Sequence, residues 1–495
     1  MTENIEVEGR ALVAKPAGSF LSVVVYGLWI VALAGSAALM FLDIPNVVVG
    51  GATLLLLLVY LVIGLPIGVA LIVASLVCMA GVTNWRLAEI SLQTSVFTSV
   101  SSWSFVVIPL FVLMGTALWT SGLTTKAYDA ARVFTGRLPG GLATSTTFAG
   151  AALAASSGSS MAIVMSLGRM AIPEMLKSGY SPALATGSVA VVGTLGQIIP
   201  PSILLVIYAG LAETPIGPQL MAALVPGLLL SLSYVAVITI WALVSPSSAP
   251  PANLGQVTSK MKMQALIGLL PVILVIIVVL GGMFAGIFTA TEASAVGAVV
   301  ALLVGWLSMG KQARNPRSAI TYLVTTIQET VNTIAGLFLI LVGAFLITGA
   351  MARSGLTQQT SEWILSLGLD ATGLLFALIV LYLVLGMFLE SLPMILLTVP
   401  IFQAALEALG IDMIWFGVFL VIVCELGLVF PPIGIITFIV HKMTKDPRTG
   451  LGHDIALGTV FKGIMPFVGA ALVILALLIL FPSIAMWLPS ISSSR

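Results

Sequence analysis

Three glutamates lie inside or against long apolar runs of the sequence, where an unpaired ionised side chain is costly and therefore usually serves a function. They are Glu292, Glu390 and Glu425. Glu390 or Glu425 can carry a coupling proton, contact a cation or hydrogen-bond a helix end. Glu292 lies in the segment Phe288–Ala293, which is typical of a helix start, so we expect it to act as a structural cap.

A cluster of small polar residues interrupts an apolar segment in the first half of the chain, at residues 156–160. A helix broken in this way at membrane depth is tolerated only where its bare backbone is buried in protein or lines a cavity. We therefore interpret the segment at about 141–172 as a re-entrant helical hairpin. The hydroxyl oxygens of Ser157, Ser159 and Ser160 at its tip favour a hard monovalent cation.

The second half of the chain contains a matching apolar segment at about 372–402, and its interruption consists of Gly386, Glu390, Ser391 and Pro393. By the same argument this segment is a second re-entrant hairpin. The two tips are expected to meet near the middle of the membrane, with Glu390 and Ser391 at the second tip.

The chain contains an internal repeat. The segment Leu195–Pro201, of the pattern LGxxxPP, recurs as Leu426–Pro432, and the triplet SGL occurs at 121–123 and again at 354–356. Each half thus runs through a helix, an SGL turn, an interrupted hairpin and a helix broken at LGxxxPP. Two broken helices at matching positions are typical of secondary transporters, because half-helix ends and unwound carbonyls bind ions at the repeat interface.

Tandem prolines explain where the two long helices break. Pro200 and Pro201 have no N–H to donate, so carbonyls one turn earlier lose their partners and are expected to face the neighbouring hairpin tip. Gly196 and Gly427 let the backbone come close at the same level. The alternative is an ordinary pair of proline kinks with small-residue packing, against which the in-register repetition of hairpin and break argues.

Two further positions match between the halves. Pro173 and Pro400 each close a hairpin in this interpretation, and Glu425 occupies the position that Thr194 has in the first half. The residues expected to contact substrate or to take part in coupling are Thr194, Glu390, Ser391 and Glu425.

Composition places the chain in a lipid bilayer before any motif is considered. Of 495 residues, 59% are hydrophobic and 7% are charged, and the charges collect in short islands between apolar runs. Those runs are long enough to cross a bilayer, which takes about 20 residues. The net charge of +1 gives no reason to expect a nucleic-acid partner. Because the sequence lacks enzyme motifs and metal-ligand spacings, we expect no enzyme, no cofactor and no metal other than sodium.

Hydropathy predicts an all-α polytopic membrane protein of two repeats, each with a re-entrant hairpin and a broken transmembrane helix. The expected spans are 20–42, 52–82, 97–120, 183–212, 219–244, 264–286, 291–309, 320–350, 412–440 and 459–488. The expected divisions are a polar N-terminal tail at 1–18, an extra transmembrane helix at 19–50, a first repeat at 51–245 with its broken helix at 183–212, a polar connection at 246–263, a second repeat at 264–488 with its broken helix at 412–440, and a C-terminal tail at 489–495.

Short signatures spread over both halves make the sequence recognisable. They are Ser157–Ser160, Ile172–Met175, Gly179-Tyr180 and Leu195–Ile203 in the first half, and Gly282–Ala293, Leu385–Glu390, Pro400-Ile401, Gly410–Asp412 and Pro431–Gly434 in the second. With these signatures, which spread over about residues 52–488, the sequence resembles the large membrane subunit of the tripartite ATP-independent periplasmic (TRAP) transporters.

The resemblance implies an elevator-type importer in the bacterial inner membrane, driven by a sodium gradient. It also implies two partners, a periplasmic substrate-binding protein and a small four-helix membrane subunit, and a small organic acid as substrate. By this resemblance the sodium ligands lie at the hairpin tips and the broken helices. The positions carried over are Ser157, Gly158, Ser159, Gly196, Ile199 and Pro200 in the first half and Gly386, Glu390, Gly427 and Pro431 in the second, with Ser160 added for its hydroxyl.

Three features depart from the family pattern. Ala290 stands where the family usually has proline between two threonines, and Ala404 stands where a second proline often follows Pro400. An extra helix at 21–42 precedes the family-like start. That helix is too short to be a fused four-helix subunit, so we expect the small subunit to be a separate chain.

The coupling ion stays open at this point. Sodium-coupled import of a small organic acid is the leading hypothesis, and a proton-coupled transporter that uses Glu390 or Glu425 is the first alternative. A channel is a further alternative. Because no Arg lies inside a hydrophobic run, helix ends and hydroxyls would have to bind a substrate carboxylate.

Overall fold

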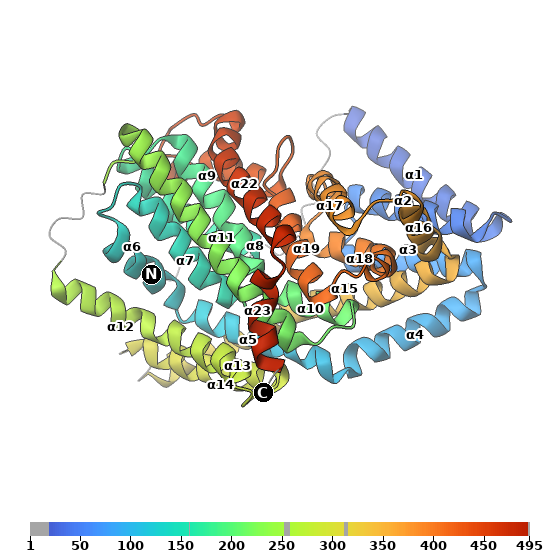
Figure 1. Cartoon of the computed structure of the whole chain (residues 1–495), viewed down its shortest axis with the longest axis horizontal. Coiled ribbons are helices and arrows are strands. Elements are labelled where there is room, and N and C mark those ends of the chain that lie inside the picture. Colours follow the sequence, from blue (N-terminus) through green and yellow to red (C-terminus); the bar gives the residue numbers. More distant parts are fainter. Residues whose placement is uncertain (1–18, 158, 252–257, 311–314, 494–495) are drawn as a thin grey trace.

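The computed structural model describes residues 19–157, 159–251, 258–310 and 315–493, and this part of the chain contains helices and no strand (Figure 1). Seven of its helices are long and apolar enough to cross a membrane, and further apolar helices have 10–17 residues. The predicted all-α polytopic membrane fold is confirmed.

Both halves show the element order that the repeat predicts, in which η1, η2 and η3 are 3-10 helices and η4 is a π-helical turn. The first half contains α1 (Ser19–Phe41), α2 (Asn46–Val62), α3 (Ile67–Val82), α4 (Trp85–Ser101), η1 (Trp103–Val106), α5 (Val107–Thr120), α6 (Leu123–Thr135), α7 (Gly141–Ser157), α8 (Ser160–Lys177), α9 (Pro182–Val192), η2 (Gly193–Gln197), α10 (Ile203–Leu211), α11 (Ile216–Val244) and η3 (Pro246–Ser248). The second half contains α12 (Ser259–Ile276), η4 (Ile277–Gly281), α13 (Gly282–Phe284), α14 (Ala290–Ser308), α15 (Pro316–Ser354), α16 (Leu356–Ser366), α17 (Ala371–Gly386), α18 (Ser391–Ala408), α19 (Met413–Gly427), α20 (Ile435–Thr444), α21 (Pro447–Gly450), α22 (Leu457–Leu480) and α23 (Ser483–Ser493).

The SGL triplets form equivalent turns in the two halves. Helix α5 ends before Gly122 and helix α15 ends before Gly355, and both glycines have a φ of 76°, a left-handed conformation that other residues rarely adopt. Each turn leads into a short helix, α6 or α16. A hairpin (α7–α8 or α17–α18) and a broken helix (α9–α10 or α19–α20) then follow in the same order.

The two halves are interlocked, because early helices of each half pack against later helices of the other. Helix α15 packs along α3 and α14 packs along α5, while α6 contacts α12 and α16 contacts α2. In Figure 1, α12 and α14 lie along one edge of the molecule and α1 to α4 along another, with α8, α10 and α19 between them. The hairpins and broken helices are therefore held between helices from both repeats.

The extra helix ahead of the repeats, α1, lies against α2 and α3. The hydroxyl of Ser36 donates to the carbonyl of Ala32 at 2.6 Å and lies 2.5 Å from the hydroxyl of Tyr60 on α2. The opposite side of α1 exposes large apolar side chains, as a helix at a lipid surface does.

The structure differs from the predicted spans at three places, one of which is 97–120, where residues 97–101 belong to α4 and the rest forms η1 and α5. The expected single span at 52–82 is two helices, because Pro66 has no N–H with which to continue α2 and instead precedes the first turn of α3. The expected span at 459–488 is likewise divided into α22 and α23, with Pro482 at the break. Helix α23 also covers most of the expected C-terminal tail at 489–495.

Pro173 and Pro400 do not close the hairpins as predicted. They lie inside α8 and α18, which continue to Lys177 and Ala408. A proline within a membrane helix is tolerated when neighbouring groups satisfy the carbonyl that loses its partner. The second arm of each hairpin is therefore longer than the sequence predicted.

The start of α14 confirms the structural role expected for Glu292. The backbone N–H of Thr289 donates to Glu292 Oε2 at 2.8 Å, and the backbone N–H of Glu292 donates to Thr289 Oγ1 at 3.3 Å. This reciprocal pair is a capping box, which satisfies two N–H groups that the helix itself leaves without partners.

Replacing Thr289 by alanine is expected to lower the stability of the protein by about 1 kcal/mol, because the N-cap acceptor of α14 is lost. The measurement is thermal unfolding of the purified protein in detergent. Thr291→Ala, two residues along the same helix, leaves the cap in place and serves as the control. Equal losses in the two variants would contradict the assignment.

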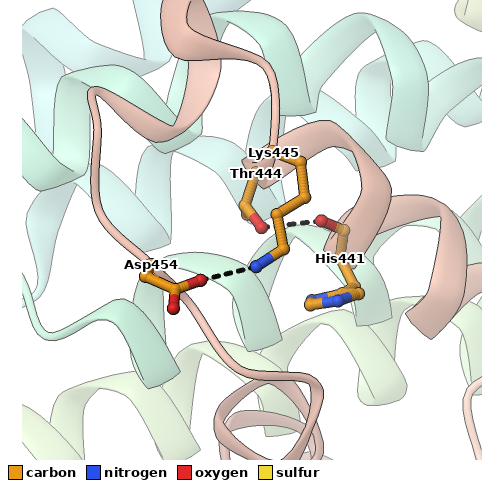
Figure 2. Close-up of polar contacts among 4 residues, drawn as sticks. All are labelled: His441, Thr444, Lys445 and Asp454. Atoms are coloured by element: carbon orange, nitrogen blue, oxygen red, sulfur yellow. Dashed lines mark hydrogen bonds and ion pairs between the residues drawn. The ribbon is translucent and has the colours of Figure 1, made fainter.

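The loop after the second broken helix is fixed by polar contacts at its base (Figure 2). Lys445 Nζ donates to Asp454 Oδ1 at 2.6 Å, and Thr444 Oγ1 donates to the carbonyl of His441 at 2.7 Å. The hydrogen bond and then the charge of Lys445 lower the pKa of Asp454 below its usual value. Both side chains of the ion pair are exposed, so the pair orders the loop and contributes little to global stability.

Candidate functional site

A cavity of about 350 Å³ lies where the two hairpin tips meet the broken helices. Ser159 and Ser160 line it from the first hairpin, Glu390 and Ser391 from the second, and Glu425 from α19, the first part of the second broken helix. Among the described residues that line the cavity, none is Lys, Arg or His. Its polar surface therefore consists of hydroxyl, carboxylate, amide and backbone groups.

Glu425 joins the two hairpins. The hydroxyl of Ser160, at the start of α8, donates to Glu425 Oε2 at 2.6 Å, and the hydroxyl of Ser391, at the start of α18, donates to Glu425 Oε1 at 2.7 Å. The side chain is only 1% exposed. Each carboxylate oxygen thus bonds a serine from a different repeat, and both bonds lie inside the protein.

Two long helices begin at the cavity. Helix α8 starts after Ser159, whose hydroxyl accepts a hydrogen bond from the N–H of Ala162 at 3.4 Å, and α18 starts after Glu390. Helix N-termini carry partial positive charge and backbone N–H groups without helical partners. They are thus the groups in this cavity that suit an anion, while the carboxylates and hydroxyl oxygens suit a cation.

Gly386 and Gly427 hold the second hairpin against the second broken helix. A Cβ atom added to Gly386 would lie 2.6 Å from the Cα of Gly427, and one added to Gly427 would lie 2.9 Å from the Cα of Gly386 and from the carbonyl oxygen of Tyr382. The two backbones therefore touch, as expected for Gly427. Because Gly427 is only two residues after Glu425, this contact fixes the end of α17 beside the cavity.

Gly196 makes the corresponding contact in the first half, but against a side chain. A Cβ atom added there would overlap the end of the Ile163 side chain and would lie 3.7 Å from the backbone nitrogen of Ser160. The turn η2 thus passes close to the start of α8. Its tolerance for a larger residue depends on how far Ile163 can move.

Several carbonyls at the helix breaks have partners within the chain, although the missing proline N–H groups were expected to leave such carbonyls without partners. Ser202 Oγ donates to the carbonyl of Gln197 at 2.5 Å. In the second half, the N–H of Ile436 donates to the carbonyl of Leu428 at 3.1 Å, and Thr437 Oγ1 donates to that of Val429 at 3.1 Å. Residues just beyond each break thus donate to carbonyls that the interrupted helix leaves without a helical partner.

The remaining predicted positions lie away from the cavity lining or outside the described residues. Thr194 donates to the carbonyl of Val191 at 2.6 Å and lies 3.2 Å from the hydroxyl of Tyr234, within its own repeat. The other predicted residues that are not among those that line the cavity are Gly196, Ile199, Pro200, Gly386, Gly427 and Pro431. Gly158 lies outside the described residues, and so does the side chain of Ser157, the last residue of α7.

Part of the cavity wall was not predicted from the sequence. Gln197 lines it from the end of η2, and Thr333 and Gly336 line it from the middle of α15. Thr330, Thr333 and Gly336 are spaced three residues apart and place small groups next to one another along α15. That spacing is a signal by which α15 could have been identified as part of the wall.

Comparisons with known proteins agree with this architecture. The family profile described as "Tripartite ATP-independent periplasmic transporter, DctM component" matches residues 54–484. The C4-dicarboxylate TRAP transporter large permease protein DctM of Pseudomonas aeruginosa is 33% identical over 81% of this chain and 89% of its own length. The sialic acid TRAP transporter large permease protein SiaM of Vibrio cholerae is 29% identical over 86% of this chain and 95% of its own. Among solved structures, the YdaH transporter of Alcanivorax borkumensis shares the fold, with a TM-score of 0.58 over 81% of this chain and 89% of that one at 15% identity.

Proposed function

The chain belongs to the DctM family of TRAP transporters, and on this premise we propose that it is the large permease subunit of a sodium-coupled importer of a small organic acid. As a member of that family it is a secondary transporter that depends on a substrate-binding protein, and its relatives are permeases rather than enzymes. We place it in the bacterial inner membrane, with a separate small four-helix subunit and a periplasmic binding protein as partners.

The observation that carries the proposal is the chemistry of the cavity wall. Glu390 and Glu425 lie on it, and Lys, Arg and His are missing from its described lining. An organic acid that entered this cavity alone would meet two carboxyl groups in a membrane interior, where like charges repel strongly. A cation bound by the neighbouring hydroxyl and carboxylate oxygens removes that repulsion. Coupling to a cation meets this requirement, and the serine hydroxyls beside the carboxylates support sodium as that cation.

The substrate carboxylate itself is expected to bind at the starts of α8 and α18. Their N-terminal N–H groups can receive an anion without any cationic side chain. Because one helix belongs to each hairpin, the substrate would contact both repeats at once. The binding of substrate and cation at the meeting point of two repeats is typical of secondary transporters.

The elevator motion is proposed for the same elements. The hairpins α7–α8 and α17–α18 and the broken helices α9–α10 and α19–α20 surround the cavity and would move as one unit. Helices α2, α3, α12 and α14, which pack against α5, α6, α15 and α16, would form the stationary part. The cavity would then be exposed to each side of the membrane in turn.

Sodium is expected to raise the melting temperature of the purified full-length protein in detergent, relative to potassium at the same ionic strength. A cation that binds only the folded state contributes about 2.7 kcal/mol at 100 times its dissociation constant. Ser159→Ala should reduce the sodium effect, because Ser159 offers a hydroxyl at the cavity. The exposed Ser101 on α4, which bonds its own helix, provides the control variant Ser101→Ala.

The same titration at two pH values separates the alternatives. One outcome is a melting temperature that is unaffected by sodium but depends on pH, with this pH dependence abolished in Glu390→Gln or Glu425→Gln. That result would identify a proton, rather than sodium, as the coupling ion. Uptake into proteoliposomes that fails to saturate with substrate, or that ignores the cation gradient, would indicate a channel instead.

A further inference from the structure

We propose that Glu425 is a positioning residue that ties the two hairpin tips together across the cavity, and that its two hydrogen bonds rather than its charge hold this tie. The inference deepens the proposed transport function and relies on it for the consequence for uptake only. The tie itself is a property of the folded chain without ligand.

The bonds of Glu425 connect two helices, α8 and α18, that otherwise pack against different helices of the protein. Helix α8, the second arm of the first hairpin, packs mainly on α7, α9, α20 and α21. Helix α18, the second arm of the second hairpin, packs mainly on α16, α19, α15 and α10. Glu425 lies on α19 between them and accepts from Ser160 at 2.6 Å and from Ser391 at 2.7 Å. The Glu425 side chain thus connects the first turn of α8 with the first turn of α18.

The first repeat does not supply an equivalent tie. Thr194 occupies the position that matches Glu425, but its hydroxyl bonds Val191 in its own helix and faces Tyr234 on α11 of the same repeat. A threonine side chain is also too short to reach two partners on opposite sides. The connection between the hairpins is therefore asymmetric and depends on the longer, two-pronged side chain in the second repeat.

The tie has a direct consequence for ligand entry. A serine hydroxyl has one proton to donate, so Ser160 and Ser391 cannot donate to a ligand while they donate to Glu425. A substrate that draws on either hydroxyl must first break one of the two bonds, which frees one hairpin tip from the other. Entry of substrate and separation of the tips are thereby linked.

The distance between the hairpins tests the proposal directly. Spin labels are placed at Met165 on α8 and at Phe388 in the second tip, which are 43% and 63% exposed and take no part in the cavity contacts. Pulsed dipolar spectroscopy on the full-length protein in detergent, without sodium or substrate, then reports the distribution of separations. The native Cys78 and Cys424 are both buried and are protected from the label.

The expected result is one narrow distribution in the parent protein and in Glu425→Gln, because an amide can accept from one serine and donate to the other. Glu425→Leu has a similar volume but no hydrogen bonds, and it should shift the ratio of joined to separated tips by about tenfold or more. Thr194→Val removes a buried hydroxyl at the matching position and should leave the distribution unchanged. Glu425→Leu should also lose uptake, because the two hairpin tips would no longer be held together in the absence of substrate.

Two outcomes would overturn the proposal. A distribution in Glu425→Leu that equals that of the parent would mean that the bonds do not hold the tips, and a distribution in Glu425→Gln as broad as in Glu425→Leu would mean that the charge does. If Glu425→Leu does not fold, Ser160→Ala and Ser391→Ala each remove one bond and must each broaden the distribution relative to Thr194→Val. Because no cation is present, a failure of sodium coupling leaves this measurement unaffected.

Discussion

Alanine at Gly427 is expected to weaken cation binding by about ten- to a hundredfold, whereas alanine at Gly196 should change it much less. The added Cβ at Gly427 meets backbone, at 2.9 Å from both the Cα of Gly386 and the carbonyl oxygen of Tyr382. Backbone cannot rotate away, so α17 must separate from α19. That displacement moves the second hairpin tip relative to Glu425 and distorts the cavity.

At Gly196 the added Cβ meets the flexible end of Ile163 instead, and the nearest backbone atom, the nitrogen of Ser160, is 3.7 Å away. A change of rotamer at Ile163 can relieve the contact. The measurement is a sodium titration of the melting temperature for both variants, with expression level and monodispersity as checks on folding. Equal sodium affinities in the two variants, or a larger loss at Gly196, would contradict the packing argument.

The order of elements could be predicted from the sequence because local chemistry determines it. The helices before the SGL triplets end because the backbone is left-handed at Gly122 and Gly355, and that requirement is visible in a single residue type. The two LGxxxPP motifs end helices for an equally local reason, the missing N–H of proline. Because both signals occur twice in the same order, the repeat and the positions of its hairpins follow from them.

Predictions of helix ends from proline were wrong where tertiary packing determines whether a helix continues through the proline. Pro66 divides a run that hydropathy alone treats as one span, while Pro173 and Pro400 lie within continuous helices. The residue type is the same in all three cases. What differs is whether neighbouring groups can satisfy the carbonyl that loses its partner, and a single sequence does not contain that information.

The residues of the candidate site were predicted from their types, but the contacts between them were not. Ser160, Ser391 and Glu425 were each expected to take part in binding or coupling, yet nothing in the sequence connects residues that lie 34 and 265 positions apart. Their contact depends on how the two repeats interlock. For the same reason Thr194 was included although its hydroxyl is directed into its own repeat, and Thr333 on α15 was omitted.

The interlock of the repeats can be tested at the contact of α9 with α22. Gly187 and Gly463 lie backbone to backbone there, and a Cβ added to Gly463 would overlap the carbonyl oxygen of Ala183. Gly463→Ala is therefore expected to destabilise the protein by about 1–3 kcal/mol, since the helices must move apart. This loss exceeds the gain of about 1 kcal/mol that alanine brings to a helix interior.

Gly469 on the same helix provides a matched control, because an added Cβ there meets nothing within 4 Å. Gly469→Ala keeps the gain in helix propensity without the clash, so the protein should be as stable as the parent or slightly more stable. Thermal unfolding followed with a thiol-reactive dye suits this pair of variants, since Cys78 and Cys424 are buried until the protein opens. If Gly463→Ala melted at or above the temperature of Gly469→Ala, the close contact between the first broken helix and α22 would not contribute to holding the repeats together. A lower melting temperature for Gly463→Ala alone would locate part of that stability at the surface where a half-helix of the first repeat crosses a helix of the second.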